Sequence, residues 1–164
     1  MFFYFRVMKF QISRATDTDL SLMQRLFYQT VTSYGSLIFT KDEIKIYSRL
    51  ATNKEYWHKK FREDFIYNAK LNGEIIGSFC MDKKGNIEYI FVHMNYHGQG
   101  IAKAMFRTIE EVARQQNIDT LTTQISILTK GFFQKHGFEM IKNSVKVVGG
   151  EEVVTYTAVR HLKN

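Results

Sequence analysis

The chain has 164 residues, about the size of one domain, and its 45% hydrophobic and 24% charged residues are an ordinary globular balance. It has no proline and a single cysteine, Cys80, which excludes collagen-like sequences, proline-rich linkers, internal disulfides and cysteine-rich zinc modules. Lys and Arg outnumber Asp and Glu by 23 to 16, giving a net charge of +7. This charge favours anionic ligands without choosing among nucleic acids, acidic membranes and phosphorylated cofactors.

Neither a membrane segment nor a nucleic-acid tail is expected. No stretch approaches the roughly 18 to 20 apolar residues of a membrane span, and the positive residues are scattered rather than gathered in one run. Residues 1–7 are apolar but are interrupted by Arg6, and they are too short for a secretory signal. We expect residues 1–7 to be an N-terminal extension and residues 8–164 to be one domain. Cytoplasmic is the default location.

The first part of the chain predicts one short strand and two helices. Phe10 to Ala15 has strand character, and Thr16 is a candidate cap for a helix that ends near Tyr34. Thr40-Lys41-Asp42-Glu43 has the form of a capping box, which predicts that a second helix begins there. A loop or a further short helix with Tyr56, Trp57 and Phe61 follows.

From Phe65 onward, β-rich runs take over. The runs Phe65 to Leu71, Glu74 to Met81 and Asn86 to His93 predict an antiparallel meander, whose first turn, Asn72-Gly73, favours type I′. Next come a helix from Ile101 that Asn117 closes, a strand from Leu121 to Ile127 and a short helix from Thr129 to His136. Two last strands flank Gly149-Gly150. The order β-α-α-β-β-β-α-β-α-β-β predicts an α+β domain around one mixed, mostly antiparallel sheet.

The segment between the third strand of the meander and the next helix is the best candidate for a binding site. Its residues His97-Gly98-Gln99-Gly100 place small residues just before a helix N-terminus, where backbone N–H groups and the helix dipole attract phosphate. A dinucleotide fingerprint is disfavoured because Lys103 stands at the third glycine position, and a Walker A loop because no Gly-Lys-Ser or Gly-Lys-Thr is present. A plain tight turn remains the alternative on these residues alone.

Two motifs together resemble the GNAT superfamily of acetyl-CoA-dependent N-acyltransferases. The first is His97-Gly98-Gln99-Gly100-Ile101-Ala102, which is similar to the family pattern Arg/Gln-x-x-Gly-x-Gly/Ala after a strand. The second is Phe132-Phe133-Gln134-Lys135-His136-Gly137-Phe138, an aromatic pair followed by a Gly-Phe break. The expected order of elements also matches the family, from about Met8 to the end of the chain.

The resemblance implies a site for acetyl-CoA. The strand that ends at His93 would splay from the strand that begins at Leu121, and the pantetheine arm would lie between them. The residues implied to contact the cofactor are Ile90, Phe91, Val92, His97, Gly98, Gln99, Gly100, Ile101, Ala102, Lys103, Ser126, Phe132 and Lys135. No metal is expected.

Two positions depart from the family pattern. His97 replaces the usual Arg or Gln, which removes one side-chain contact and leaves the backbone amides in place. Phe133 stands where many members have a Tyr that protonates the departing thiolate, and Phe has no proton to give. We therefore expect a different acid, or protonation by solvent. This departure supports the alternative of a non-catalytic CoA-binding or sensor domain on the same fold.

The implied reaction is direct attack of a substrate amine on the thioester, and the amine must first lose a proton. Glu88 is the leading candidate for the base, with His93 behind it, and Tyr89 is a possible acid for the thiolate. An acyl-enzyme on Cys80 is disfavoured, because no activating base lies near it in the sequence. Each of these residues also has a purely structural interpretation.

Tyr34, Tyr56 and Trp57 are candidates for the acceptor pocket, because the helices before the meander cover that pocket in relatives. The expected acceptor is a small-molecule or peptide amine. A nucleic-acid-binding module, supported only by charge and aromatic content, is the least favoured hypothesis. A monomer or a homodimer is expected.

Overall fold

The N-terminal part of the domain contains β1, Gln11–Arg14, followed by two long helices. The structure is a computed structural model that describes residues 9–37, 39–148 and 150–163. Thr16 begins a short 3-10 turn, Asp17–Asp19, that leads into α1, Leu20–Tyr34, and a second turn, Gly35–Leu37, follows. The predicted extension, residues 1–7, lies outside the described residues.

The predicted capping box begins α2, Lys41–Thr52. The Thr40 hydroxyl accepts a hydrogen bond from the Glu43 N–H at 3.2 Å, and the Glu43 carboxylate accepts one from the Thr40 N–H at 2.7 Å. The segment for which a loop or a further short helix is predicted forms a helix, α3, Lys54–Glu63, which the predicted order of elements does not include. It forms because Asn53, where α2 ends, accepts the N–H of Tyr56 on its side chain at 3.0 Å and so caps a new helix at once.

The antiparallel meander is confirmed. It consists of β2, Phe65–Leu71, β3, Glu74–Met81, and β4, Asn86–Val92. Asn72 and Gly73 both have positive φ angles, 50° and 81°, as the predicted type I′ turn requires. In the second turn the Asp82 carboxylate accepts hydrogen bonds from the N–H groups of Lys84 at 2.8 Å and Asn86 at 2.9 Å.

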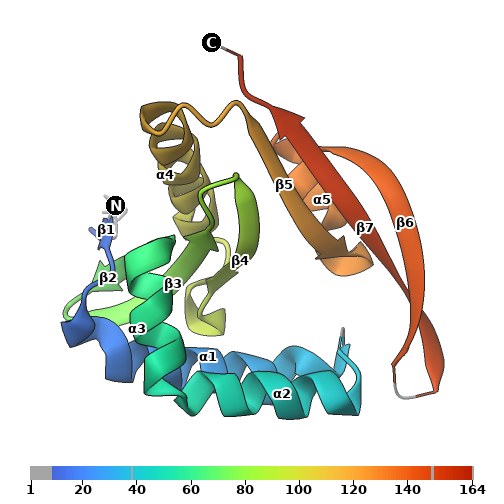
Figure 1. Ribbon diagram of the computed structural model, residues 1–164, viewed down its shortest axis with the longest axis horizontal. Coiled ribbons are helices and arrows are strands. Elements are labelled where there is room, and N and C mark those ends of the chain that lie inside the picture. The colour runs from blue at the N-terminus through green and yellow to red at the C-terminus, as the bar shows by residue number, and fades with distance from the viewer. Residues whose placement is uncertain (1–8, 38, 149, 164) are drawn as a thin grey trace, which may run out of the picture.

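The C-terminal half adds two helices and three strands. A short 3-10 turn, Met94–Tyr96, precedes α4, Ile101–Gln115, and the chain continues through β5, Thr120–Ser126, α5, Ile127–Lys135, β6, Glu139–Val148, and β7, Glu151–His161. Asn117 has the expected left-handed conformation, with φ of 55°. The seven strands lie in the order β1-β2-β3-β4-β5-β7-β6 (Figure 1). This is the predicted α+β fold, with α3 as the added element.

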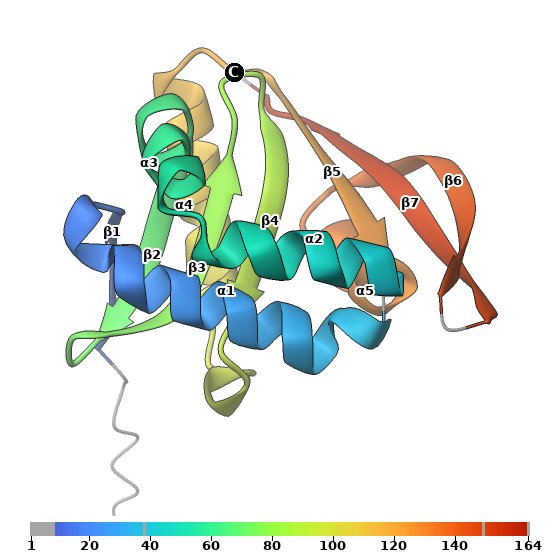
Figure 2. The same ribbon diagram turned by 60° about the horizontal axis from the view of Figure 1, so that its bottom comes forward.

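Helices cover both faces of the sheet, and each face has its own apolar core. On one face α4 packs on β2, β3 and β4, and α5 packs on β5 and β7, around Met105, Phe106, Leu121 and Phe133. On the other face α1 and α3 pack on β2 and β3 around Met23 and Trp57. Figure 2 shows α1 and α2 running side by side across this second face.

Strands β4 and β5 are paired at one end alone. Their parallel pairing joins Asn86 to Thr122 and Ile87 to Thr123, and no further pair follows among the described residues. The Thr122 N–H donates to the Gly85 carbonyl at 3.0 Å, which ties the turn before β4 to β5. Beyond this end the two strands diverge toward α1 and α2 (Figure 1). The predicted splaying of the two strands is therefore confirmed.

Candidate functional site

The glycine loop before α4 has the backbone geometry of an anion site. Gly98 and Gly100 have φ angles of 73° and 80°, which favour glycine, and an added Cβ at either would meet nothing within 4 Å. The first intrahelical bond at this end runs from the Ala104 N–H to the Gly100 carbonyl, at 3.0 Å. The amides of Ile101, Ala102 and Lys103 therefore have no acceptor within the helix. Open space beside these amides and the helix dipole fit a pyrophosphate.

His97 has a contact within the chain that the sequence did not indicate. Its Nε2 lies 2.8 Å from the carbonyl oxygen of Val92, the last residue of β4. Behind it, Gln99 donates from its side chain to the Asn95 carbonyl at 3.3 Å. The side chains of His97 and Gln99 thus bond to backbone carbonyls of the chain itself.

The open edge of β4 offers backbone groups from alternate residues. The His93 N–H donates to the Ile76 carbonyl in β3 at 2.8 Å. Because successive residues of a strand direct their backbone groups to opposite edges, those of Phe91 also face β3, where Phe91 lies opposite Ser78. The groups of Ile90 and Val92 face the edge that β5 leaves open. Because the Val92 carbonyl is bonded to His97, the groups available to an extended ligand are both backbone groups of Ile90 and the N–H of Val92.

Glu88 occupies a β-bulge in β4. Cys80 of β3 lies opposite Tyr89 and Met81 lies opposite Ile87, so that Glu88 is the extra residue. The bulge shifts the alternation of side chains. Ile87 lies in the core below α4, whereas Glu88 and Tyr89 both point to the face of α1 and α3. Glu88 stands one residue beyond the last pair of β4 and β5, where the strands begin to separate.

The Glu88 carboxylate belongs to a charged trio with Lys60 of α3 and with Asp64, the residue that follows this helix. The Lys60 ammonium bonds to Glu88 Oε2 and, at 2.7 Å, to Asp64 Oδ2. Glu88 is the accessible member, because its side chain is 38% exposed against 15% for Lys60 and 12% for Asp64. Burial opposes the charge of Lys60, but its bonds to the two carboxylates outweigh burial and raise its pKa above the usual value. Two carboxylates and one ammonium leave one net negative charge.

Cys80 lies beneath the trio, with its Sγ 3.8 Å from Glu88 Oε2 and 3.9 Å from Asp64 Oδ2. It is fully buried, and burial raises the pKa of its thiol, so that the nucleophilic thiolate is disfavoured. The ligand atoms of Asp64, Cys80 and Glu88 lie within 4.8 Å of one another, a spacing that suits a metal ion. The cation that bonds to both carboxylates in this structure is the Lys60 ammonium.

Tyr89 and His93 have structural contacts. The Tyr89 ring packs against Phe27 and Phe91 at centroid distances of 5.9 and 5.0 Å. Burial raises the pKa of Tyr89 well above 10.0, which makes its phenol a weaker acid. His93 caps the turn that follows β4, because its Nδ1 accepts the Asn95 N–H at 3.2 Å.

The predicted residues of β5 and α5 lie beside the start of α4. Ser126 is buried where β5 passes into α5, and the Phe132 ring packs on Phe106 of α4 at 6.3 Å. Phe133 is a buried core residue with no polar atom on its side chain. Lys103 and Lys135 are exposed cations. Burial lowers the pKa of His136; the charges of Arg160, Lys135 and Lys103 lower it further, and that of Glu110 raises it.

The three residues predicted to line the acceptor pocket do not form one group in the structure. The Tyr56 ring lies 5.9 Å from the Lys60 ammonium, beside the charged trio. Trp57 is 1% exposed and donates its ring N–H to the Ala51 carbonyl at 3.1 Å, so it is a core residue and lines no surface pocket. The side chain of Tyr34 lies outside the described part of the structure.

Lys60 and Asp64 were missed by sequence reasoning. Their spacing of four residues on a helix is visible in the sequence, but it is typical of any exposed ion pair. Their contact with Glu88 depends on how α3 packs on β3 and β4.

None of the described helices combines the length and the apolar character needed to cross a membrane.

The chain is similar to known proteins in sequence and in fold. Residues 39–158 match the family model of the acetyltransferase (GNAT) domain. The chain is 24% identical over 132 residues to the uncharacterized N-acetyltransferase YafP of Escherichia coli K12, covering 80% of this chain and 83% of that protein.

Two solved structures share the fold. The PaiA N-acetyltransferase of Thermoplasma acidophilum, solved in complex with coenzyme A, superposes with a TM-score of 0.79 at 14% identity, covering 94% of this chain and 99% of that one. A GCN5-related N-acetyltransferase of Rhodopseudomonas palustris superposes with a TM-score of 0.77 at 16% identity, covering 93% and 95%. The chain belongs to the GNAT family of acetyltransferases.

Proposed function

We propose that the chain binds acetyl-CoA along the open edge of β4 and the N-terminus of α4, and that Glu88 takes the proton from the acceptor amine. The position of Glu88 carries the proposal. It is the bulged residue of β4, the accessible member of the charged trio, and the residue just past the last pair of β4 and β5. A carboxylate at the point where the strands separate lies next to any ligand that extends between them.

The chain's own residues fit the cofactor. The amides of Gly98 to Lys103 would hold the pyrophosphate. The backbone groups of Ile90 and the N–H of Val92 would pair with an extended arm, because the Val92 carbonyl is bonded to His97. Phe132 borders this region, and Lys103 and Lys135 add positive charge for the remaining phosphate. Ser126 lies across the gap, at the end of β5. Acetyl-CoA supplies the acetyl group on an activated thioester.

The charged trio performs the proton transfer. Its net negative charge attracts an acceptor ammonium, and the exposed Glu88 carboxylate takes the proton directly or through one water molecule. Lys60 bonds to the Glu88 carboxylate and fixes its orientation. Asp64, nearly buried, holds Lys60 in place.

The proposal assigns no acid to the departing thiolate other than solvent. Phe133 has no proton, and the raised pKa of Tyr89 argues against that phenol. His93 is left in a positioning role at the turn. The buried, protonated thiol of Cys80 supports direct transfer rather than an acyl-enzyme, and no metal takes part in the proposed mechanism.

The acceptor is proposed to be a small-molecule or peptide amine that reaches Glu88 from the side of Tyr56. The lone cysteine supports a reducing compartment, and we propose the cytoplasm as the location and a monomer or homodimer as the form. A sensor that binds CoA without turnover is not favoured, because the charged trio provides an accessible base.

The test is Glu88→Gln, with turnover followed by thiol release on an amine panel and acetyl-CoA binding followed by calorimetry. We expect kcat to fall by about 100-fold or more, with the acetyl-CoA Kd changed by less than about twofold. The deficit should shrink at high pH, where more of the amine is already deprotonated. Glu111→Gln, an exposed position on α4, is the matched control. Equal activity of Glu88→Gln and wild type at every pH would overturn the assignment.

A further inference from the structure

Strands β5, β7 and β6 present a polar face toward α1 and α2. Leu121, Ile125 and Ala158 point into the core below α4 and α5, so the alternate residues of these strands point the other way. These are linked by side-chain hydrogen bonds, from Gln124 Nε2 to Thr157 Oγ1 at 2.8 Å and between the hydroxyls of Ser144 and Thr155 at 2.9 Å. We call this surface the polar wall; it consists of Gln124, Lys142, Ser144, Thr155 and Thr157.

The register of the sheet places the polar wall in line with Glu88. Ile87 and Thr123 form the last pair of β4 and β5, so Glu88 and Gln124 are the next residues on either side of the gap. Gln124 lies opposite Thr157, and Thr157 lies opposite Lys142. One row thus crosses four strands, from Glu88 to Lys142. With strands about 4.8 Å apart, the Cα atoms of Gln124 and Lys142 are about 10 Å apart.

The two ends of this row carry opposite charges. Glu88 belongs to a trio with one net negative charge. Lys142 is exposed and has no ion-pair partner among the residues that the structure describes. Glu139 is on the same face of β6 as Lys142. It lies opposite Val159, one row closer to the end at which β4 and β5 are paired. Between the charged ends lie the neutral groups of Gln124 and Thr157.

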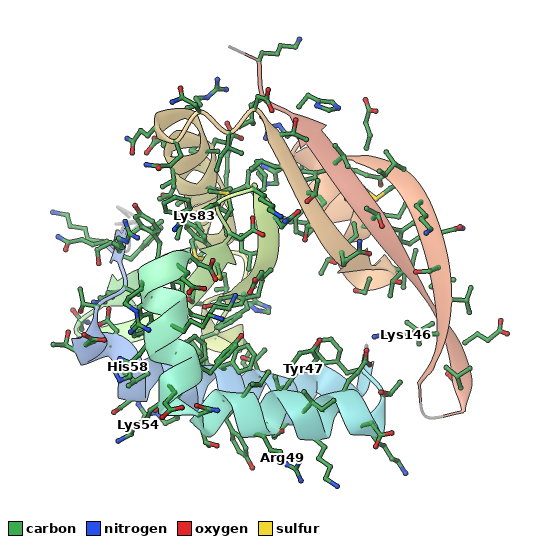
Figure 3. The ribbon with its side chains drawn as sticks, viewed as in Figure 1. Tyr47, Arg49, Lys54, His58, Lys83 and Lys146 are labelled. Atoms are coloured by element: carbon green, nitrogen blue, oxygen red, sulfur yellow. The ribbon has the colours of Figure 1, made fainter. Side chains whose placement is uncertain are left out.

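Further along this face, the charged residues are Lys146 of β6 and Glu151 at the start of β7. Lys146 follows Lys142 and Ser144 on the same face of β6, and its ammonium lies 3.1 Å from Glu43 Oε2 at the start of α2. In Figure 3 Lys146 reaches from β6 toward the side of α2 that carries Tyr47. The ion pair connects β6 to the start of α2, and the charges of Lys146 and Glu43 neutralise each other. Lys142 is therefore the cation left available to a ligand on the wall.

We propose that the acceptor is a primary amine with a neutral hydrogen-bonding body and an anionic end, its amine at Glu88 and its anion at Lys142. This inference rests on the proposed role of Glu88. Amide or hydroxyl groups in the body match Gln124 and Thr157, and the anion is a carboxylate or a phosphate. A polyamine is a poor acceptor, because its second ammonium would face Lys142 across the same row.

The test uses four tripeptide amides that share the sequence Gly-Gly-X and a free N-terminal amine, where X is Glu, phosphoserine, Gln or Lys. Only the charge at the far end changes, and the first two compounds distinguish a carboxylate from a phosphate. We expect the KM for the two anionic peptides to be about tenfold below that for the Lys peptide, with the Gln peptide between them. Calorimetric titration of each N-acetylated product into the CoA-loaded protein should give the same order of affinities.

Lys142→Glu should invert this order, raising the KM for the anionic peptides about tenfold and lowering it for the Lys peptide, with kcat changed by less than about twofold. Lys54→Glu makes the same charge change at the exposed first residue of α3, far from the polar wall, and should leave the order unchanged (Figure 3). If all four peptides are acetylated with equal KM and Glu88→Gln still abolishes turnover, this inference fails while the role of Glu88 stands. If Glu88→Gln retains full activity, the proposed function itself fails.

Discussion

Lys60 in α3 and Glu88 in β4, separated by 28 residues in the sequence, form an ion pair at the point where β4 and β5 part. Asp64 bonds to the same ammonium at 2.7 Å, so that one cation holds two carboxylates. The contact joins the helical face of the domain to the bulge of the central strand. It makes the orientation of Glu88 depend on α3, an element outside the family's sequence motifs.

Removing the Lys60 ammonium should impair turnover without weakening cofactor binding. In Lys60→Met two neighbouring carboxylates lose their shared cation, so the ionised pair becomes less favourable and the acidic limb of kcat/KM should move to higher pH. We expect kcat near neutral pH to fall about tenfold. The acetyl-CoA Kd, measured by calorimetry, should stay within about twofold.

Lys60→Arg retains the charge and should restore most of the activity of Lys60→Met. Lys59→Met removes a neighbouring cation that faces Glu63 at 3.9 Å, and it should behave as wild type. A pH profile of Lys60→Met that superposes on that of wild type would show that Lys60 serves only the packing of α3.

Gly100→Asp should weaken acetyl-CoA binding by at least about tenfold. The substitution places a carboxylate at the N-terminus of α4, beside amides that are proposed to hold the pyrophosphate, and like charges repel. Gly73→Asp is the matched control, because Gly73 also has a left-handed φ, 81°, and open surroundings, but lies in the turn between β2 and β3. Equal cofactor affinities for the two variants, measured by calorimetry, would remove the loop from the site.

Gly85→Ala should destabilise the domain far more than Gly73→Ala. A Cβ at Gly85 would lie 2.3 Å from the Thr120 carbonyl oxygen and 2.7 Å from Ile118 Cγ2, at a φ of 90°. Because the Gly85 carbonyl also bonds to β5, relief of this clash must shift the paired end of β4 and β5. We expect a loss of about 2 to 4 kcal/mol in the free energy of unfolding. For Gly73→Ala we expect about 1 kcal/mol, because the left-handed backbone disfavours alanine there but the added Cβ meets no other atom. Urea unfolding of both variants measures the difference.

The link between α2 and the β6–β7 hairpin should be sensitive to acid. Burial opposes the ionisation of Glu43, but the hydrogen bond from the Thr40 N–H and the contact with Lys146 outweigh it and lower the pKa of Glu43 below its usual 4.5. A lowered pKa in the folded state stabilises the protein above the unfolded value, and the contribution is lost as pH falls through the folded value. Glu43→Ala should therefore cost about 1 kcal/mol near pH 7, and the difference from wild type should shrink below about pH 4.

Urea unfolding at both pH values measures this effect. Glu55→Ala, in the first turn of α3, removes a carboxylate from a comparable helical position with no hairpin opposite, and it serves as the control. A difference between Glu43→Ala and wild type that is the same at both pH values would show that the charge of Glu43 has no role in the link.

Local patterns in the sequence were sufficient for most of the elements, because the signals that place them act over a few residues. The capping box at Thr40, the type I′ turn at Asn72 and the left-handed Asn117 all form as predicted. The glycine loop belongs to this class, since its conformation depends on Gly98 and Gly100 themselves. The sequence left α3 open between a loop and a short helix, because its cap, Asn53, follows directly on α2 and leaves no linker to mark a boundary.

The sequence by itself determined the α+β class, the meander, the glycine loop before α4 and the resemblance to the GNAT family. Only the tertiary structure placed Glu88 in a bulge, brought Lys60 and Asp64 to its carboxylate, and moved Trp57 from a predicted pocket into the core. The row from Glu88 to Lys142 likewise exists only in the folded sheet, because it crosses four strands that are distant in the chain. Such contacts follow from register and packing, which depend on the whole sheet rather than on neighbouring residues.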